Sequence, residues 1–247
     1  MPRLTGKVAL VTGASRGIGA AIARKLASDG AAVAVNYARN AAAADQVVAD
    51  VERAGGRAVA VRADLTDVGQ IEPMVARAAD ALGGRIDVLV NNAGWAQFGR
   101  PLGTLDLDHY HRQMDLNVRG LLFATQAAVA RMPAGGRVIN IGSGVTRSPS
   151  PGGVVYCLSK AAVEMITRVH AKELGSKGIT VNCVSPGVTE SDLMNEVMPP
   201  EYLPTIITQT PLGRLGQPQD IADVVAFVAS DEARWITGEI LGATGGL

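Results

Sequence analysis

Short apolar runs typical of buried strands recur along the chain, and each is followed by a stretch in which apolar residues, many of them alanine, repeat with helical spacing. The runs cover residues 8–11, 32–35, 58–61, 86–90, 137–141, 179–184 and 239–241. Strands that alternate with helices pair in parallel, and the helices cover both faces of the sheet. We therefore expect a single α/β domain, residues 1–247, built on a doubly wound parallel sheet of about seven strands.

An eight-stranded α/β barrel shows the same alternation of strands and helices. A barrel needs one strand more than the apolar runs supply, and it has no particular need of the glycine-rich turn that follows the first run. No shift in composition and no long Pro, Gly or Ser linker divides the chain. An open sheet in one domain explains the pattern better than a barrel.

The first strand leads into a turn that is rich in glycine. Gly13, Gly17 and Gly19 are spaced four and two residues apart, just before a helix-period pattern. Glycine allows a tight turn and a close approach of the backbone to a ligand. The helix start offers unpaired N–H groups and the positive end of a dipole, which suits a pyrophosphate. Because the spacing differs from GxGxxG, a purely structural turn is an alternative at this point.

Ligands of an open doubly wound sheet bind at the carboxyl ends of the strands. After the second strand the chain has Tyr37 and Arg39 but lacks the carboxylate with which an NAD site holds the ribose hydroxyls. Arg39 and Arg16 suit the 2′-phosphate of NADP instead, because guanidinium groups bind phosphate through charge-assisted hydrogen bonds. The sequence thus favours NADP(H) over NAD(H), with solvated surface arginines as the alternative.

Further candidates follow the third and fourth strands. Asp64 is placed to accept a hydrogen bond from an adenine amino group, and Leu65 to cover the ring. Asn91, Ala93 and Gly94 belong to an Asn-Asn-Ala-Gly turn. Its small residues permit close approach to a ribose, and its asparagine side chains can brace neighbouring strands. Either group is also compatible with a plain turn.

A tyrosine and a lysine share one face of a predicted helix. Tyr156 and Lys160 are four residues apart in a helical stretch over residues 155–174. An ammonium beside a phenol favours the phenolate, so we expect the phenol's pKa to fall from near 10 toward the working range of a general acid or base. Ser143, at the end of the fifth strand, is placed to hold a carbonyl oxygen while the tyrosine donates its proton.

Composition and charge limit the kinds of molecule that the protein is expected to bind. The 23 basic and 23 acidic side chains give a formal charge of zero, which argues against nucleic acid or an anionic membrane as a partner. Apolar residues make up 47% of the chain, but no run approaches the roughly 18 residues of a membrane span, and the first residues lack a signal-peptide core. A soluble, cytoplasmic protein with a small-molecule substrate is expected.

The cysteines and histidines do not predict a metal site. Cys157 and Cys183 have no metal or redox spacing and lie in apolar patterns, so we expect small core residues rather than a disulfide or catalytic thiols. His109 and His111 are two residues apart and would point away from each other on a helix.

Together these residues resemble the short-chain dehydrogenase/reductase family in order and spacing, over practically the whole chain. The shared motifs are Thr12-Gly13-x-x-x-Gly17-x-Gly19, Asn91-Asn92-Ala93-Gly94, Asn117, Ser143, Tyr156-x-x-x-Lys160 and Pro186-Gly187. The resemblance implies a Rossmann-type sheet and hydride transfer between a nicotinamide cofactor and a carbonyl or alcohol.

The resemblance also implies a role for each motif residue. Tyr156 is the acid/base, Ser143 positions and polarises the substrate oxygen, and Lys160 binds the nicotinamide ribose and tunes Tyr156. Asn117 is expected to hold a water that passes protons from Lys160 toward solvent. The residues expected to contact NADP(H) are Gly13, Ser15, Arg16, Gly17, Ile18, Gly19, Tyr37, Arg39, Asp64, Leu65, Asn91, Ala93, Gly94, Tyr156, Lys160, Pro186, Gly187, Val188 and Thr189, with Ser191 near the phosphates.

Residues 188–212 are expected to form a substrate lid of two short helices, as in the family. The apolar residues in this stretch are Met194, Met198, Pro199, Pro200, Tyr202, Leu203, Ile206 and Ile207. Methionine adapts to varied apolar shapes, so a hydrophobic ketone fits better than a sugar. The alternative is that these residues are ordinary core. Trp95, Phe98, Val145 and Thr146 are further candidates for the pocket wall.

Within the family, the chain is most similar to 3-oxoacyl-carrier-protein reductases and to reductases of polyketide-type ketones. The ending Ala243-Thr244-Gly245-Gly246 is closer to the polyketide-type members. Carrier-protein users tend to place basic residues near the strand that leads to the serine, but residues 132–136 are uncharged, which leaves Arg131 and Lys177 for such a role. Free ketones are therefore preferred over a substrate carried by an acyl carrier protein.

Two other functions remain open on the sequence. One is an NAD-dependent alcohol or sugar dehydrogenase, for which the carboxylate after the second strand is missing. The other is a redox-sensing module that binds a dinucleotide without turnover and has no need of Ser143, Tyr156 and Lys160. The resemblance further implies a homotetramer, in which the helices that carry Asn117 and Tyr156 pair and the last strand forms a second interface.

Overall fold

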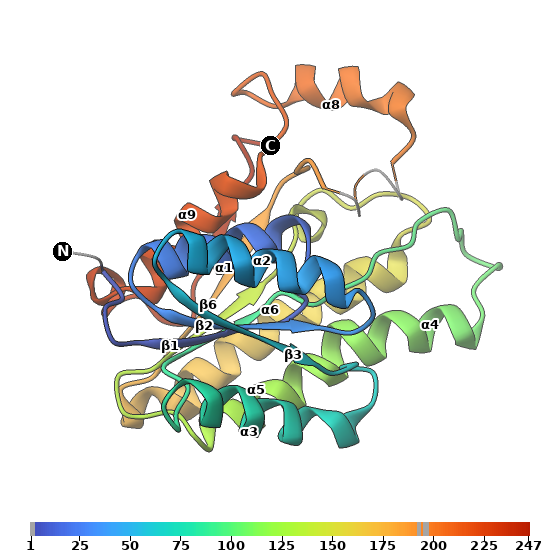
Figure 1. Cartoon of the computed structure of the whole chain (residues 1–247). Helices are drawn as coiled ribbons and strands as arrows, with labels where there is room; N and C mark the ends of the chain where they lie inside the picture. Colours follow the sequence, from blue (N-terminus) through green and yellow to red (C-terminus); the bar gives the residue numbers. More distant parts are fainter. Residues whose placement is uncertain (1–2, 192–193, 195–197) are drawn as a thin grey trace.

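A computed structural model describes residues 3–191, 194 and 198–247 of the chain. In this part of the chain, seven parallel strands form one open sheet with helices on both faces (Figure 1). The strands are β1 (Val8–Val11), β2 (Ala32–Tyr37), β3 (Arg57–Arg62), β4 (Val88–Asn91), β5 (Arg137–Ile141), β6 (Thr180–Pro186) and β7 (Ile240–Ala243). Their order is β3-β2-β1-β4-β5-β6-β7, so β3 and β7 are edges and the barrel alternative is excluded. The doubly wound sheet predicted from the apolar runs is confirmed.

Helices cover both faces of the sheet, and α8 (Leu203–Gln209) stands apart from it (Figure 1). They are α1 (Gly17–Ser28), α2 (Ala41–Arg53), α3 (Ile71–Leu82), α4 (Leu107–Met114), α5 (Leu121–Val129), α6 (Val154–Leu174), α8 (Leu203–Gln209) and α9 (Pro218–Ala229). Side chains of α1, α2 and α9 form one hydrophobic core with the sheet, and those of α3 and α5 form most of a second core on the opposite face. Figure 1 shows these two layers, with β1 and β2 between them.

Burial explains why these segments fold as they do. All four residues of β1 are buried, because the strand pairs with β2 and β4 and is covered by helices on both faces. Helix α1 places Ile22 and Leu26, four residues apart, on the face that packs in the core, and both are fully buried. Burying each such side chain contributes about 1.5–3 kcal/mol, so a Leu26→Ala change is expected to cost about 2–5 kcal/mol of stability.

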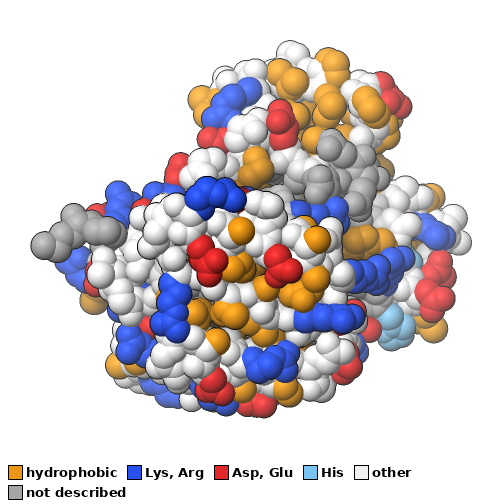
Figure 2. All heavy atoms as spheres, viewed as in Figure 1, with side chains coloured by type: hydrophobic (Ala, Val, Ile, Leu, Met, Phe, Trp, Pro, Cys, Tyr) orange, Lys and Arg blue, Asp and Glu red, His pale blue; other side chains and the backbone are white. Residues whose placement is uncertain are grey.

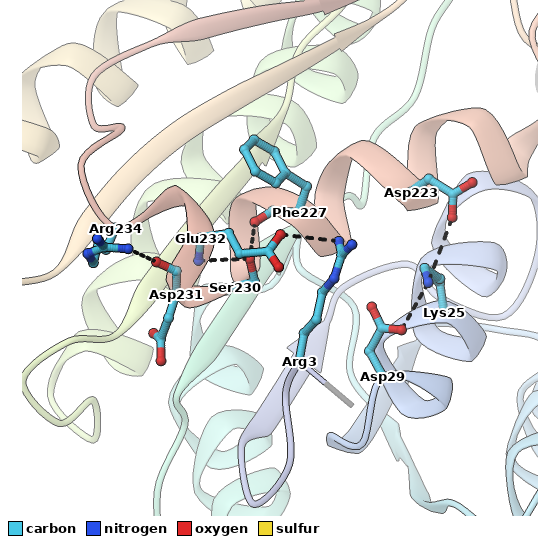
Figure 3. Close-up of polar contacts among 9 residues, drawn as sticks. All are labelled: Arg3, Lys25, Asp29, Asp223, Phe227, Ser230, Asp231, Glu232 and Arg234. Carbon is cyan, nitrogen blue, oxygen red and sulfur yellow. Dashed lines mark hydrogen bonds and ion pairs between the residues drawn. The ribbon is translucent and has the colours of Figure 1, made fainter. Parts of the chain in front are cut away.

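Ion pairs join α1 to α9 and the N-terminal segment to the short helical turn Asp231–Ala233 that follows α9 (Figure 3). Nζ of Lys25 lies 2.9 Å from a carboxylate oxygen of Asp29 and 4.0 Å from one of Asp223. Arg3 pairs with Glu232 at 3.7 Å. Exposed pairs of this kind contribute little to stability, so the apolar contact between α1 and α9 carries most of the packing energy.

The order of the strands determines where a ligand site can form. After β3 the chain crosses to the other side of β1 and continues with β4, so β1 pairs with β2 on one side and with β4 on the other. Ligands of open α/β sheets bind at this switch point, outside the carboxyl ends of the strands. The turn after β1 and the turn after β4 therefore meet there.

The sequence predicts no membrane span, no metal site and no disulfide, and the described residues give the following picture. Within them, no helix combines the length and apolar character that crossing a membrane requires. No cluster of three or more His, Cys, Asp or Glu side chains suited to a metal ion occurs in the same residues. Cys183 is fully buried as predicted, whereas Cys157 is only half-buried on α6, and both are free thiols.

Candidate active site

The glycine turn after β1 lies directly against the turn after β4. Gly13 has φ +61°, a conformation that L side chains rarely adopt. A Cβ atom at Gly13 would lie 2.8 Å from Cα of Ala93, so a larger residue requires the backbone to shift. The two turns that the sequence singled out are thus packed against each other at the switch point.

Two asparagine side chains hold this turn in place. Oδ1 of Asn36 accepts the N–H of Gly13 (3.1 Å), and Nδ2 of Asn36 donates to two carbonyl oxygens at the end of β3 (both 3.2 Å). Nδ2 of Asn92 donates to the carbonyl oxygens of Thr12 (2.9 Å) and Gly13 (3.0 Å). The role of Asn36 was missed, because the sequence places it after the second strand, whereas β2 continues to Tyr37.

The N-terminus of α1 points out of the glycine turn. The helix begins at Gly17, after Arg16 in an extended conformation, and its first turn, all of it described, contains no acidic residue and no side-chain cap. The N–H groups at such a helix start have no partner within the helix, and the dipole makes this end positive. A Cβ at Gly17 would lie 3.6 Å from Cβ of Ser191, so Ser191 lies beside the glycine turn, and its expected place near the phosphates stays a prediction.

The end of β2 presents arginine and no carboxylate. Tyr37 is the last residue of the strand and is half-buried. Arg39, two residues later, is exposed and makes no ion pair or hydrogen bond to any residue that the structure describes. Arg16 is exposed at the start of α1. The surroundings of this turn therefore favour an anionic group over a ribose hydroxyl.

The residues that follow β3 form a closed turn. Oδ1 of Asp64 accepts hydrogen bonds from the N–H (2.9 Å) and the hydroxyl (2.7 Å) of Thr66. Leu65 is buried, and its carbonyl oxygen would lie 2.9 Å from a Cβ at Gly120. Asp64 keeps its second carboxylate oxygen for another donor, while Leu65 belongs to the second hydrophobic core and lies against Gly120.

The side chain of Asn91 makes hydrogen bonds within the fold. Nδ2 of Asn91 donates to Oδ1 of Asn140 and to Oγ1 of Thr125, each at 2.9 Å. The side chain therefore braces β4 against β5 and α5, which is the bracing role that the sequence allowed. Oδ1 of Asn91 is buried without a hydrogen-bond partner among the described residues, and the expected contact of Asn91 with a cofactor stays a prediction.

Ser143, Tyr156 and Lys160 come together at the carboxyl end of β5. Ser143 follows this strand, and its hydroxyl lies close enough to the phenol of Tyr156 to lower the phenol's pKa. Nζ of Lys160 lies 5.9 Å from the centre of the Tyr156 ring and donates to the carbonyl oxygen of Ile141 (2.8 Å). The side chain of Lys160 is 5% exposed, so its ammonium lies in a nearly dry environment.

Desolvation is the largest cause of the pKa shifts of Tyr156 and Lys160. It raises the pKa of Tyr156 above its usual value of 10, and the nearby hydroxyl of Ser143 offsets only part of this change. The expected lowering by Lys160 is therefore wrong for this structure, because desolvation of the phenol outweighs any effect of an ammonium that is bound to Ile141. Burial also lowers the pKa of Lys160 from 10.5 to about 8.

Asn117 lies in a π-helical turn (Asp115–Gly120) between α4 and α5. Nδ2 of Asn117 donates to the carbonyl oxygen of Trp95 (2.9 Å) and to Oγ of Ser159 (3.0 Å), and Oδ1 accepts the N–H of Trp95 (2.8 Å). Such π-helical turns are frequent at functional sites. The amide thus ties the loop after β4 to α6, next to the Tyr156 turn of the helix, whereas its predicted water remains a prediction.

The segment after β6 is held between the C-terminus and the base of the lid. Pro186 ends β6, and a Cβ at Gly187 would lie 2.9 Å from Cα of Thr244. Thr189 forms a parallel bridge with Gly216, in which the N–H of Gly216 donates to the carbonyl oxygen of Val188 (3.0 Å). These contacts fix residues 186–189 at the same end of the sheet as Ser143.

The predicted lid stands away from the body of the protein. Helix α8 and the turn Pro200–Tyr202 project above the sheet (Figure 1), with hydrophobic side chains on the surface (Figure 2). No residue of α8 is buried, and Tyr202 is 58% exposed. The alternative of an ordinary core is therefore wrong for these residues; residues 192–193 and 195–197 of the lid lie outside the described part.

The ring of Phe98 packs beside Tyr156. It contacts the ring of Tyr156 edge to face, with 5.4 Å between the centres. A Cβ at Gly153 would lie 2.7 Å from Cδ1 of Phe98, so the glycine before α6 makes room for this ring. Val145 and Thr146 lie in the short helical turn that follows the serine. Sequence reasoning named Phe98 but gave no role to Gly153.

The described residues fit a dinucleotide. Three features suited to phosphate groups lie along one side of the switch point. They are the glycine turn, which forms a cradle without room for a Cβ at Gly13, the positive end of α1, which has no side-chain cap, and the guanidinium of Arg39, which has no partner among the described residues. The serine, tyrosine and lysine lie at the end of β5, on the other side of β4 from the glycine turn. An extended ligand crossing the carboxyl ends of these strands would contact both groups.

Comparisons with known proteins agree with this geometry. A family model described as "Enoyl-(Acyl carrier protein) reductase" matches residues 13–247. A probable tetrahydroxynaphthalene reductase of Zymoseptoria tritici is 40% identical over 256 residues, covering 98% of this chain and 95% of the relative. A 3-oxoacyl-[acyl-carrier-protein] reductase of Synechocystis is 40% identical over 250 residues, covering 100% of this chain and 99% of the relative.

Solved structures extend the likeness to three dimensions. The angucycline C-6 ketoreductase LanV, whose structure contains bound NADP, superposes with a TM-score of 0.93 at 45% identity, covering 99% of this chain and 96% of that chain. Both groups of reductases that the sequence motifs indicated are thus present among the relatives.

Proposed function

The chain belongs to the short-chain dehydrogenase/reductase family, and from that premise we propose that it is an NADPH-dependent reductase that converts a hydrophobic ketone into a secondary alcohol. The observation that carries the proposal is the meeting of Ser143, Tyr156 and Lys160 at the end of β5. A protein that only senses a dinucleotide has no use for a proton donor beside a serine hydroxyl.

The chain's own residues supply the proton and orient the substrate. The hydroxyl of Ser143 holds the ketone oxygen, and the neutral phenol of Tyr156 donates its proton to that oxygen as charge develops on it. NADPH, when bound, supplies the hydride. The raised pKa of Tyr156 keeps the phenol protonated at neutral pH, which suits the reducing direction.

The preference for NADPH rests on the arginines at the end of β2. Arg39 is exposed without a partner among the described residues, and no carboxylate is present in β2 or the turn after it. A 2′-phosphate would be bound there by charge-assisted hydrogen bonds, whereas NADH offers only hydroxyls. This weighs against an NAD-dependent alcohol or sugar dehydrogenase. The bound NADP of LanV supports the same cofactor.

The substrate class is inferred from the apolar residues of the expected lid and from the cations near β5. The half-buried apolar side chains of α8 and the exposed ring of Tyr202 would bury themselves against a hydrophobic ketone. Arg131, one of two cations available for a carrier protein, is paired with Glu72 at 3.3 Å. We therefore infer a free ketone, of the polyketide type that the relatives' names describe, as the substrate.

The proposal includes a homotetramer, built through α4, α5, α6 and β7. Leu158, Met165 and Val169 are 50%, 57% and 44% exposed and lie on one face of α6, because they are separated by seven and four residues. Phe123 on α5 is 38% exposed, and Trp235, five residues before β7, is 96% exposed. Apolar surfaces of this extent are typical of protein interfaces.

The reaction is tested by following NADPH oxidation with a panel of aromatic bicyclic ketones, aliphatic ketones and sugars. We expect turnover with the hydrophobic ketones, and we expect Tyr156→Phe to reduce kcat about 10²–10⁴-fold, because a general acid contributes that much. NADPH binding should stay within about twofold of the wild-type affinity. Tyr110→Phe, which removes an exposed hydroxyl from α4, is the matched control and should leave the rate unchanged.

Two results would contradict the proposal. Retained activity in Tyr156→Phe would remove the phenol from the reaction. Turnover of a 3-oxoacyl thioester only when it is attached to a carrier protein would show that the free-ketone assignment is wrong, although the reaction class would stand.

A further inference from the structure

Arg62, the last residue of β3, lies beside the turn after β2. In the register of the sheet it pairs with Tyr37, the last residue of β2. Its side chain is exposed, and Nε donates to the carbonyl oxygen of Ala38 (3.3 Å). The two Nη groups of the guanidinium make no hydrogen bond or ion pair to any described residue.

The surroundings of this guanidinium are positively charged. Arg39 follows the bonded Ala38 directly and is itself exposed. Nη2 of Arg77, on α3, donates to the carbonyl oxygen of Arg62 (2.8 Å). The nearest carboxylate along the chain, that of Asp64, is engaged by Thr66 through Oδ1. Three guanidinium groups thus gather around the ends of β2 and β3, where adenosine ribose binds in this class of sheet.

We propose that Arg62 is a specificity residue for NADPH: its Nε holds the turn that carries Arg39, and its Nη groups bind the cofactor's 2′-phosphate. This inference rests on the cofactor of the proposed function and adds a residue that the sequence motifs do not contain. Arginine suits both tasks because its planar fork presents donors in two directions, whereas lysine offers a single point charge. Arg62 lies on an edge strand, so solvent and ligand reach it freely.

The same strand supplies a matched control. Arg57 begins β3 and is also exposed, and its guanidinium donates to the carbonyl oxygen of Ala81. Arg57→Ala and Arg62→Ala therefore each remove one positive charge and one side chain-to-carbonyl hydrogen bond from opposite ends of one strand. Any effect of net charge or of strand stability is common to both variants, and only a local contact with the phosphate distinguishes them.

The test measures dissociation constants for NADPH and NADH by cofactor fluorescence in wild type, Arg62→Ala, Arg62→Lys and Arg57→Ala. We expect Arg62→Ala to weaken NADPH about ten- to a hundredfold, the loss typical of a charge-assisted hydrogen bond, and to change NADH less than about threefold. Arg62→Lys should recover part of the NADPH affinity. Arg57→Ala should leave both constants within about twofold of the wild-type values.

The failure of this inference is distinguishable from that of the proposed function. If wild type prefers NADPH but Arg62→Ala weakens both cofactors equally, or no more than Arg57→Ala does, Arg62 has no role in recognising the phosphate. If wild type binds NADH as tightly as NADPH, the cofactor preference itself is wrong, and the inference falls with it. Competition by adenosine 2′,5′-bisphosphate should show the same Arg62 dependence without the nicotinamide half of the cofactor.

Discussion

Tyr156 and Lys160 share a face of α6, and desolvation shifts their pKa values in opposite directions, although Lys160 is buried and Tyr156 is half-buried. A desolvated phenol resists losing its proton, so its pKa rises, whereas a desolvated ammonium resists keeping its proton, so the pKa of Lys160 falls to about 8. The hydroxyl of Ser143 lies near the phenol and the carbonyl oxygen of Ile141 accepts a hydrogen bond from the ammonium, so each group has a polar neighbour despite its desolvation.

The lowered pKa of Lys160 predicts an alkaline limit to activity. Between pH about 8 and 10.5 the folded protein loses the Lys160 proton that the unfolded chain would keep, so the positive charge disappears from the site in that range. We expect kcat/KM for ketone reduction to fall above pH about 8, while Tyr156 stays protonated. A pH profile of the free enzyme measures this.

Lys160→Arg tests the assignment, because arginine keeps its charge throughout the range. The alkaline limit should be absent from the residual activity of this variant. A wild-type rate that stays flat to pH 10, or a limit that persists in Lys160→Arg, would exclude Lys160 as its cause.

At the scale of elements, the site is held by turns rather than by the strands themselves. The glycine turn after β1 is fixed by Asn36 from β2 and by Asn92 after β4, so three elements must be in place before the cradle exists. The two ends of the segment expected to form the lid are held in a similar way, because Thr189 bridges Gly216 and the N–H of Leu212 donates to the carbonyl oxygen of Gly245 (3.1 Å).

Substitutions at two glycines would measure how much the contact between Gly13 and Ala93 restricts the residue at position 13. Gly13 and Gly55 both have positive φ, +61° and +82°, but a Cβ at Gly55 meets no heavy atom within 4 Å. Gly55→Ala should therefore cost only backbone strain, about 1–2 kcal/mol. Gly13→Ala should cost about 1–3 kcal/mol more, because its Cβ would overlap Ala93, and it should also weaken NADPH binding.

Urea unfolding and cofactor fluorescence would measure these two effects. Equal losses of unfolding free energy in the two variants would show that the contact between Gly13 and Ala93 carries no constraint. Unchanged NADPH affinity in Gly13→Ala would show that the turn does not form the cofactor cradle.

At the scale of the whole molecule, the isolated chain exposes apolar surface that the proposed tetramer would cover. The exposed side chains of α5 and α6 lie on the opposite face of the sheet from α2. We expect a mass close to four chains, roughly four times 25.5 kDa, from light scattering in solution.

Charged substitutions locate the interface. Leu158→Asp together with Met165→Asp should give smaller species, because an interface buries few unpaired charges. Ala42→Asp, at an exposed position of α2, should leave the mass unchanged. A monomeric wild type, or a tetramer that persists in the double variant, would contradict this arrangement.

The sequence by itself determined the fold class, the order of strands and helices along the chain, and the class of enzyme. Seven apolar runs separated by helix-period stretches admit little besides a parallel sheet, since its inner strands are buried on both faces, as β1, β4, β5 and β6 are here. Spacing alone placed Tyr156 and Lys160 on one face of a helix, and connectivity placed Ser143 at the end of a strand. These features depend on neighbours along the chain, which is why a linear pattern reveals them.

Only the tertiary structure decided what depends on distant neighbours. The pKa of Tyr156 rises because the folded chain removes much of the phenol's contact with water, and the spacing of residues along the chain does not predict that desolvation. Asn36 holds the glycine turn, and Arg62 reaches the turn after β2, because the sheet aligns strands that are separated by many residues. Packing also left α8 outside the core, although its apolar sequence was compatible with burial.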